Sequence, residues 1–215
     1  MSPQDTNPSS VVGQAHAAMT NAKIQFERHI RGIDRSRYSA EGIQAEISSF
    51  ANTDHARAVD KAVDQVRHRR DEAQDEVDTI RRGLTPDGDV AAELRASRFW
   101  ERTRRVLDNT DSARLFGCAH KIISTANRQQ LGTLLQELPA YLEAHGQAAE
   151  WLDAAAAEIL PEFRHAREQL TKAGQAVQIA ESNAQALRRG FTQGRPPTVL
   201  VDPGDKYDPD ASPST

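Results

Sequence analysis

The sequence predicts an all-α fold: an elongated, coiled-coil-like helical hairpin with a small helical middle block and disordered termini. Two stretches, 39–84 and 147–191, carry apolar residues at alternating three- and four-residue steps, which place them along one stripe of a helix. The composition agrees, because 27% charged and only 5% aromatic residues are typical of long, solvated helices. The near-equal lengths of the two stretches indicate an antiparallel pair within one chain. Pairing with other copies of the chain is the alternative.

The composition also limits the functions to be expected. The net charge of -4 gives the chain no overall attraction to nucleic acid or to an anionic membrane, so such binding would depend on a local patch. The single cysteine, Cys118, rules out a disulfide within the chain and fits a reducing compartment. The N-terminal residues lack the pattern of a signal peptide, and no run of about 18 apolar residues occurs. We therefore expect a cytoplasmic protein that makes no membrane contact.

Residues 11–84 are predicted to form an amphipathic helix followed by a long coiled-coil-like helix, after a disordered stretch at 1–10. Ser39 precedes the long helix and suits an N-cap, because its hydroxyl can accept a free backbone N–H. The helical phase slips near Thr53. We expect one continuous but bent helix there, with a new helix capped by Thr53 or Asp54 as the alternative. The seam of this helix includes Val59, Val63, Val66, Val77 and Ile80.

A compact block of short helices is predicted for residues 85–146. The glycines and proline between Gly83 and Asp89 end the preceding helix. Three amphipathic segments follow, joined by residues that favour caps and turns. Asn127 is the expected cap of the third segment and Gly146 its expected stop. Much of the aromatic and leucine content lies in this block, which indicates a core of its own.

Residues 147–191 are predicted to form the second long coiled-coil-like helix. Pro161 lies inside its pattern and should either kink the helix or start a new one. The Pro- and Asp-rich tail at 192–215 should be disordered, apart from a short β-prone run at 198–201. The seam of this second helix includes Phe163, Leu170, Val177 and Leu187.

No catalytic or cofactor motif occurs in the sequence. A phosphate-binding glycine loop, a nucleophile elbow and the usual zinc-binding spacings are all missing. Cys118 and His120 are two positions apart on a predicted helix, so their side chains diverge. Glu162 and His165 match one half of a di-iron motif, but such sites need a second copy and two further carboxylates. We therefore expect a non-enzymatic protein without cofactor or metal.

Two segments are candidates for binding a partner. The stretch from Arg95 to Arg105 interleaves arginines with two aromatic residues, a composition that suits phosphates or bases. The structural alternative places the aromatic residues in the core and pairs the arginines with acidic groups of neighbouring helices. The run at 198–201 suits strand addition to a partner's sheet edge, with a plain linker as the alternative. The residues concerned are Arg95, Arg98, Arg102, Arg105, Val199, Leu200 and Val201.

The sequence also resembles a known group of proteins. The resemblance rests on YSAEG at 38–42, on the stretch 84–105 that ends in RASRFWERTRR, and on LQELPAYLE at 135–143. Over about residues 38–146 the chain is similar to helical accessory proteins encoded in the virion-structure regions of tailed phages and prophages. The resemblance implies a capsid-assembly, scaffold-like or minor structural role in the host cytoplasm or the virion. The tail after Arg195 is acidic rather than basic, which departs from scaffolding proteins.

The leading expectation is thus a non-enzymatic structural or assembly protein that acts by helix–helix association and by docking of its tail. Its expected partners are copies of itself, in a homo-oligomer, or a structural protein such as a capsid protein. The alternative is a helical nucleic-acid-binding protein that uses the arginines between Arg95 and Arg105. Retention on DNA with a steep salt dependence favours the alternative, whereas self-association without such retention favours the first.

Overall fold

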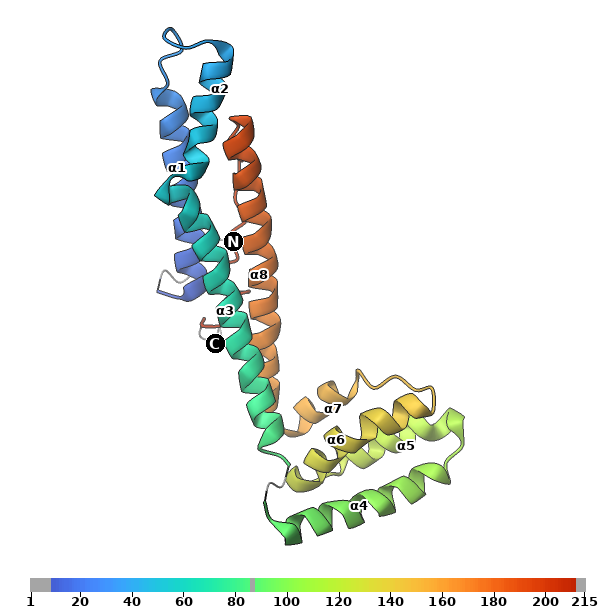
Figure 1. The fold of residues 1–215 in the computed structure, drawn as a ribbon. Coiled ribbons are helices and arrows are strands. Elements are labelled where there is room, and N and C mark those ends of the chain that lie inside the picture. Colours follow the sequence, from blue (N-terminus) through green and yellow to red (C-terminus); the bar gives the residue numbers. More distant parts are fainter. Residues whose placement is uncertain (1–8, 86–87, 212–215) are drawn as a thin grey trace, which may run out of the picture. The chain divides into compact units, whose positions relative to one another are not determined.

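The computed structural model describes residues 9–85 and 88–211, which fold into eight α-helices and one short 3-10 helix without any strand (Figure 1). The all-α prediction is confirmed. No helix among these residues is both long enough and apolar enough to cross a lipid bilayer. The helices are α1 (Val11–Gly32), α2 (Ala40–Ser49), the 3-10 helix η1 (Phe50–Asn52), α3 (Asp54–Arg82), α4 (Val90–Asp108), α5 (Ser112–Ser124), α6 (Arg128–Ala144), α7 (Leu152–Ile159) and α8 (Pro161–Gln193).

The chain divides into two compact units. Unit 1 extends to Ala73 and resumes at Gln169, and unit 2 consists of Gln74–Glu168. The first helix of unit 1, α1, begins where the hydroxyl of Ser10 accepts the backbone N–H of Gly13 at 2.9 Å. Its apolar side faces α2, α3 and α8, which complete a common core.

Three aromatic rings from different elements form the centre of the unit 1 core. Phe26 of α1, Phe50 of η1 and Phe191 of α8 are all buried, and their ring centroids lie 4.9 to 5.0 Å apart. The tilted and edge-to-face arrangement is the favourable geometry for aromatic pairs. The three rings therefore fix α1, the junction before α3 and the end of α8 together.

The apolar seams of α3 and α8 pack against each other within unit 1 (Figure 1). Asp60 pairs with Arg188 and Arg67 with Glu181, so the two helices run antiparallel there. The seam positions are therefore occupied by contacts inside one chain. In unit 1 the buried seam residues are Val59, Val63, Val66, Val177 and Leu187, and Leu170 is half-buried. In unit 2 Val77 and Phe163 are buried and Ile80 is half-buried.

The prediction of one continuous bent helix over 39–84 is wrong, because the helix ends and restarts at Thr53. This residue is extended, with φ -80° and ψ 162°. Its hydroxyl donates to the carbonyl of Phe50 at 2.7 Å and accepts the N–H of Ala56 at 3.3 Å. Short polar side chains compete with the helix for backbone partners in this way. The alternative, a new helix capped by Thr53, is the correct one.

The helix predicted for 147–191 is also divided. Residues 147–151 are not helical, α7 follows, and Leu160 is extended with φ -112° and ψ 102°. Pro161 is then the first residue of α8. Proline suits this position, because its missing N–H would have no helical partner there. Pro161 therefore starts a helix rather than bending one.

The prediction of a disordered tail at 192–215 is wrong for the part that the structure describes. Gly194, with φ +69°, ends α8 in the left-handed conformation, and residues 195–211 run back along unit 1. We call residues 195–211 the C-terminal strap. Its apolar and backbone groups find partners on α1, α3 and α8, which composition alone does not reveal. The disorder predicted for 1–10 is wrong at Ser10, which is the buried N-cap of α1. Residues 1–8 and 212–215, also predicted to be disordered, lie outside the described residues.

Unit 2 contains the three helices predicted for residues 85–146, namely α4, α5 and α6, together with α7 and the adjoining ends of α3 and α8. Asn127 and Gln130 form a reciprocal capping box at the start of α6. Gly146, with φ +68°, follows the end of that helix. The cap and the stop predicted from the sequence are both confirmed.

Candidate binding groove of unit 2

Helix α4 turns one side to the core of unit 2 and another to solvent. It begins at Asp89, whose carboxylate accepts the N–H groups of Ala91 and Ala92 at 2.9 and 3.2 Å. Thr103 and Leu107 are buried on the inner side. Four arginines recur at alternating three- and four-residue steps and so lie along one flank of the helix. They are Arg95, Arg98, Arg102 and Arg105, and all four are exposed.

Three of these arginines line an open groove of about 630 Å³ between α4 and the start of α6. We call it the arginine groove. Its α4 wall carries Arg95, Arg98, Arg102 and the half-buried ring of Phe99. Its α6 wall presents the carboxamides of Asn127, Gln129 and Gln130 and the hydroxyl of Thr133. The groove thus combines positive charge with hydrogen-bonding groups and one aromatic ring.

Two of the three guanidinium groups of the groove have no carboxylate partner among the residues that the structure describes. Arg95 lies 3.8 Å from the carboxylate of Asp89, at the margin of an ion pair. Arg98, Arg102 and Arg105 have no carboxylate partner among the described residues. Arg104, on a different side of α4, lies 3.7 Å from Asp108. The arrangement therefore differs from the structural alternative, in which neighbouring helices would neutralise the arginines.

The other flank of α4 has the opposite character. There Glu93 and Ser97 border a hollow of about 360 Å³ together with Glu137 of α6. Trp100 also borders it and meets the ring of Tyr141 edge-to-face at 5.9 Å. Since Ala96 borders both hollows, the inner side of α4 separates an acidic flank from a basic one.

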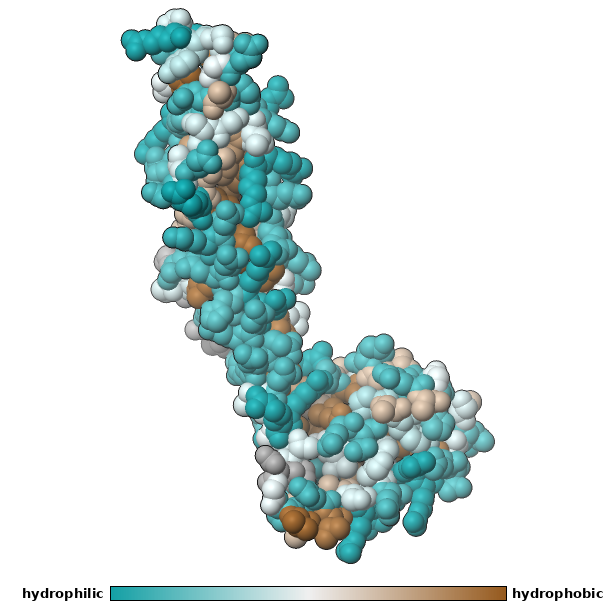
Figure 2. Space-filling view, viewed as in Figure 1, coloured by the Kyte–Doolittle hydropathy of each residue, from teal (hydrophilic) through white to brown (hydrophobic). Residues whose placement is uncertain are grey.

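Exposed apolar side chains lie beside the arginine flank. Val90 is 69% exposed and Leu94 53% exposed. Figure 2 shows hydrophobic surface over the start of α4, at the edge of unit 2. The free surface of this helix is therefore both cationic and apolar.

The second predicted binding segment belongs to unit 1 and lies in the strap. Leu200 is partly buried against the unit 1 core, whereas Val199 and Val201 are 74% and 54% exposed. The backbone of the strap already forms hydrogen bonds with side chains of α1 and α8.

Sequence reasoning missed the carboxamides of the arginine groove, because they belong to a different helix from the arginines. The cap prediction at Asn127 was the one signal that pointed to them.

The described residues contain no cluster of three or more His, Cys, Asp and Glu side chains suited to a metal ion. Cys118 accepts the hydroxyl of Thr110 at 3.7 Å, whereas the ring of His120 stacks on Trp151 at 5.6 Å. Glu162 pairs with Arg128, whose hydrogen bond lowers the pKa of the Glu162 carboxyl.

Comparison with protein-family models, curated proteins and solved structures found no match to this chain.

Proposed function

We propose that the protein is a non-enzymatic helical protein that binds the phosphate backbone of a nucleic acid in the arginine groove. The observation that carries this proposal is the row of exposed guanidinium groups at Arg95, Arg98 and Arg102, of which the latter two lack a carboxylate partner among the described residues. A guanidinium group donates two parallel hydrogen bonds to phosphate oxygens. Because Arg98 and Arg102 form no ion pair with a described residue, no such pair has to break before they bind phosphate.

The length of the arginine row fits a short stretch of nucleic acid. From Arg95 to Arg105 the helix axis rises about 15 Å. The same distance corresponds to about four stacked nucleotides of one strand. The chain as a whole is acidic, with a net charge of -4, so binding would depend on this local row rather than on overall attraction.

The opposite wall of the groove supplies groups suited to bases. Asn127 and Gln130 use their side-chain oxygens in the capping box, at 3.0 Å in each direction. Their amide N–H groups are left to donate, and Gln129 offers both a donor and an acceptor. Phe99 borders the groove and presents an aromatic surface on which a base can stack.

Fluorescence anisotropy with a labelled oligonucleotide, single-stranded and as a duplex, tests this proposal. The combined variant Arg95→Glu, Arg98→Glu, Arg102→Glu should weaken binding by about 100-fold or more at low salt. The matched control Arg28→Glu, Arg31→Glu, Arg35→Glu makes the same charge change on and beside α1 and should weaken it far less. An equal loss in both variants, or no binding by the parent protein, contradicts the proposal.

A structural or assembly role with a protein partner is the second candidate, and the exposed Val90 and Leu94 favour it. Protein interfaces are enriched in arginine and have apolar centres. Under this proposal the paired helices α3 and α8 set a spacing, and the face of α4 docks a capsid-type protein or a further copy of the chain. The resemblance to virion-assembly proteins supports the same role.

Light scattering over a range of protein concentrations tests the self-association part of this second candidate. Replacing Val90 and Leu94 by serine should abolish oligomers that form through α4 while leaving oligonucleotide binding unchanged. A parent protein that stays monomeric throughout, or oligomers that persist in the variant, would argue against self-association through α4.

A further inference from the structure

The side chain of Asn183 on α8 binds the backbone of the strap. Its carboxamide N–H donates to the carbonyl of Val201 at 2.8 Å, and its oxygen accepts the N–H of Val201 at 2.9 Å. The side chain is only 4% exposed. It offers one donor and one acceptor side by side, as the edge of a neighbouring strand does. Asn183 therefore recognises an extended chain without reading the side chain at that position.

Contacts on either side of Val201 fix the direction and register of the strap. The ammonium of Lys23 on α1 donates to the carbonyl of Thr198 at 2.8 Å. Farther along, Arg69 of α3 pairs with Asp210 at 2.9 Å. Helices α1, α3 and α8 thus all make polar contacts with the strap, at Thr198, Asp210 and Val201.

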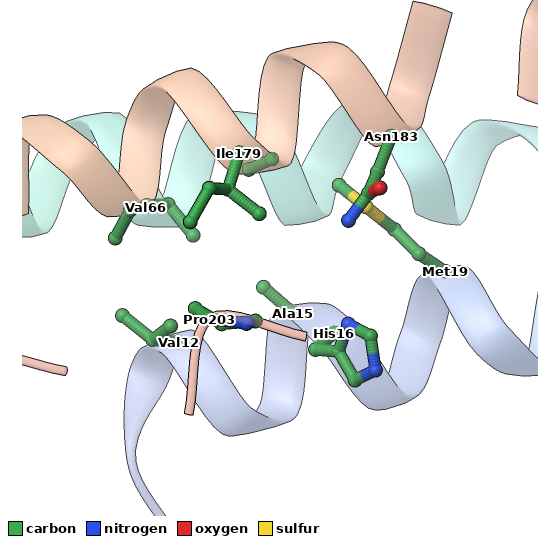
Figure 3. Close-up of a pocket in the computed structure, with 10 residues that line it drawn as sticks. Val12, Ala15, His16, Met19, Val66, Ile179, Asn183 and Pro203 are labelled. Atoms are coloured by element: carbon green, nitrogen blue, oxygen red, sulfur yellow. The ribbon is translucent and has the colours of Figure 1, made fainter. Parts of the chain in front are cut away.

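Apolar contacts complete the fit between the strap and unit 1. Leu200 packs against the core, and Pro203 is buried beside Val12 and Ala15 of α1 (Figure 3). The cavity that remains at this point measures only about 10 Å³. The surface formed by α1, α3 and α8 is therefore shaped to an extended segment with a leucine and a proline three positions apart.

The attachment of the strap to α8 favours exchange between chains. The first residues of the strap form, together with Gly194, a short hinge at 194–197, in which Gly194 has φ +69° and two prolines, Pro196 and Pro197, restrict the backbone. Gly190 faces the hinge so closely that a Cβ there would lie 2.9 Å from the carbonyl oxygen of Arg195. Short, restricted hinges are the segments at which proteins exchange an element between copies.

We propose that the surface occupied by the strap is a peptide-binding site whose second occupant is the strap of another copy of this chain. Two chains would exchange straps reciprocally and form a closed dimer. Each strap then makes on its partner the same contacts that it makes within its own chain, so the dimer gains no new kind of contact. The proposal concerns unit 1 and is independent of nucleic-acid binding by the arginine groove.

Energy transfer between two labelled chains tests the exchange. In the background Cys118→Ser, one chain carries a donor at Lys206→Cys in the strap, and the other carries an acceptor at Ala17→Cys on α1. Since neither chain holds both labels, a signal that grows with protein concentration requires association. Asn183→Ala in both chains should speed the rise of the signal after mixing by about tenfold or more, because a strap that has lost two hydrogen bonds detaches from its own chain faster. The exposed Asn21→Ala on α1 is the matched control and should leave this rate unchanged.

A second measurement covers the case in which Asn183→Ala fails to fold. A labelled synthetic peptide of residues 195–211 is added in excess to the unmodified full-length protein. Exchange predicts that the peptide binds unit 1 and that it reduces the energy transfer between the two labelled chains. A protein that is monomeric at every concentration and takes up no peptide overturns the proposal. A folded Asn183→Ala protein in which the signal rises no faster than in the parent overturns it as well.

Discussion

Gly132 of α6 allows another part of the chain to pass directly over this helix. A Cβ at this position would lie 2.2 Å from the carbonyl oxygen of Leu84, which belongs to the turn after α3. Leu84 is itself buried, with 5% of its surface exposed. The contact brings the end of α3 next to the arginine groove, which Leu84 and Thr133 also line.

Gly132→Ala should therefore lower the free energy of unfolding by about 2 kcal/mol or more, because the added methyl group meets backbone that cannot move aside. Chemical denaturation followed by circular dichroism measures the change. Gly117→Ala on α5 is the matched control, since nothing lies within 4 Å of its added Cβ. The free energy of unfolding of Gly117→Ala should rise by up to about 1 kcal/mol. Similar stability changes in the two variants would contradict the close contact.

Tyr141 is a second residue whose surroundings make a measurable prediction. Burial, and then the hydrogen bond that its hydroxyl donates to Asp108 at 2.8 Å, raise its pKa from 10.0 to about 12. Well below pH 10.0 the tyrosine is protonated in both the folded and the unfolded state. As the pH rises toward 12, the unfolded state loses its proton first, so the free energy of unfolding falls in this window.

The expected loss across that window is at most about 2–3 kcal/mol. Tyr141→Phe should remove this part of the alkaline destabilisation, although it also removes a hydrogen bond at neutral pH. Denaturation of both proteins at neutral pH and between pH 10.0 and about 12 isolates the effect. Parallel stability curves for the parent and the variant would rule out a raised pKa at Tyr141.

At the scale of elements, the cap that Thr53 forms makes α3 a separate helix. Thr53→Ala removes the cap and should lower the free energy of unfolding by about 1 kcal/mol. Thr53→Ser retains the hydroxyl and should behave like the parent protein. Thermal or chemical denaturation distinguishes the two variants. An alanine variant as stable as the parent would mean that the cap adds no net stability.

The helices themselves could be predicted from the sequence because their signals are local. Apolar spacing located the seams, and Ser39 and Asn127 are caps in the structure as expected. The prediction that the helix continues through Thr53 is wrong, because continuation of a helix competes there with capping by the threonine side chain. Neither the spacing nor the composition of the segment sets that balance.

The strap and the arginine groove could be predicted only in part, because both depend on contacts distant in sequence. The strap is ordered by Asn183 and by Lys23, which lies 175 positions before its partner Thr198. The groove needs α6 opposite α4, whereas the sequence indicates only the arginines. Partner-dependent features of this kind leave no periodic signal in the segment that carries them.

At the scale of the whole molecule, the strap should contribute to the stability of unit 1. Leu200→Ala is expected to lower the free energy of unfolding by about 1–2 kcal/mol, because part of a leucine side chain is lost from the core. The neighbouring Val199 is 74% exposed, and Val199→Ala should change stability by less than about 0.5 kcal/mol. Equal effects of the two substitutions, measured by chemical denaturation, would show that the strap does not pack through Leu200.

The central proposal is that a few exposed arginines let an acidic chain bind nucleic acid, and the salt dependence of oligonucleotide binding tests it most directly. Three phosphate contacts predict that the logarithm of the association constant falls with the logarithm of salt concentration with a slope of about -2 to -3. Arg98→Ala should reduce the magnitude of this slope by about one. No binding at low salt, or a slope that Arg98→Ala leaves unchanged, would contradict the claim.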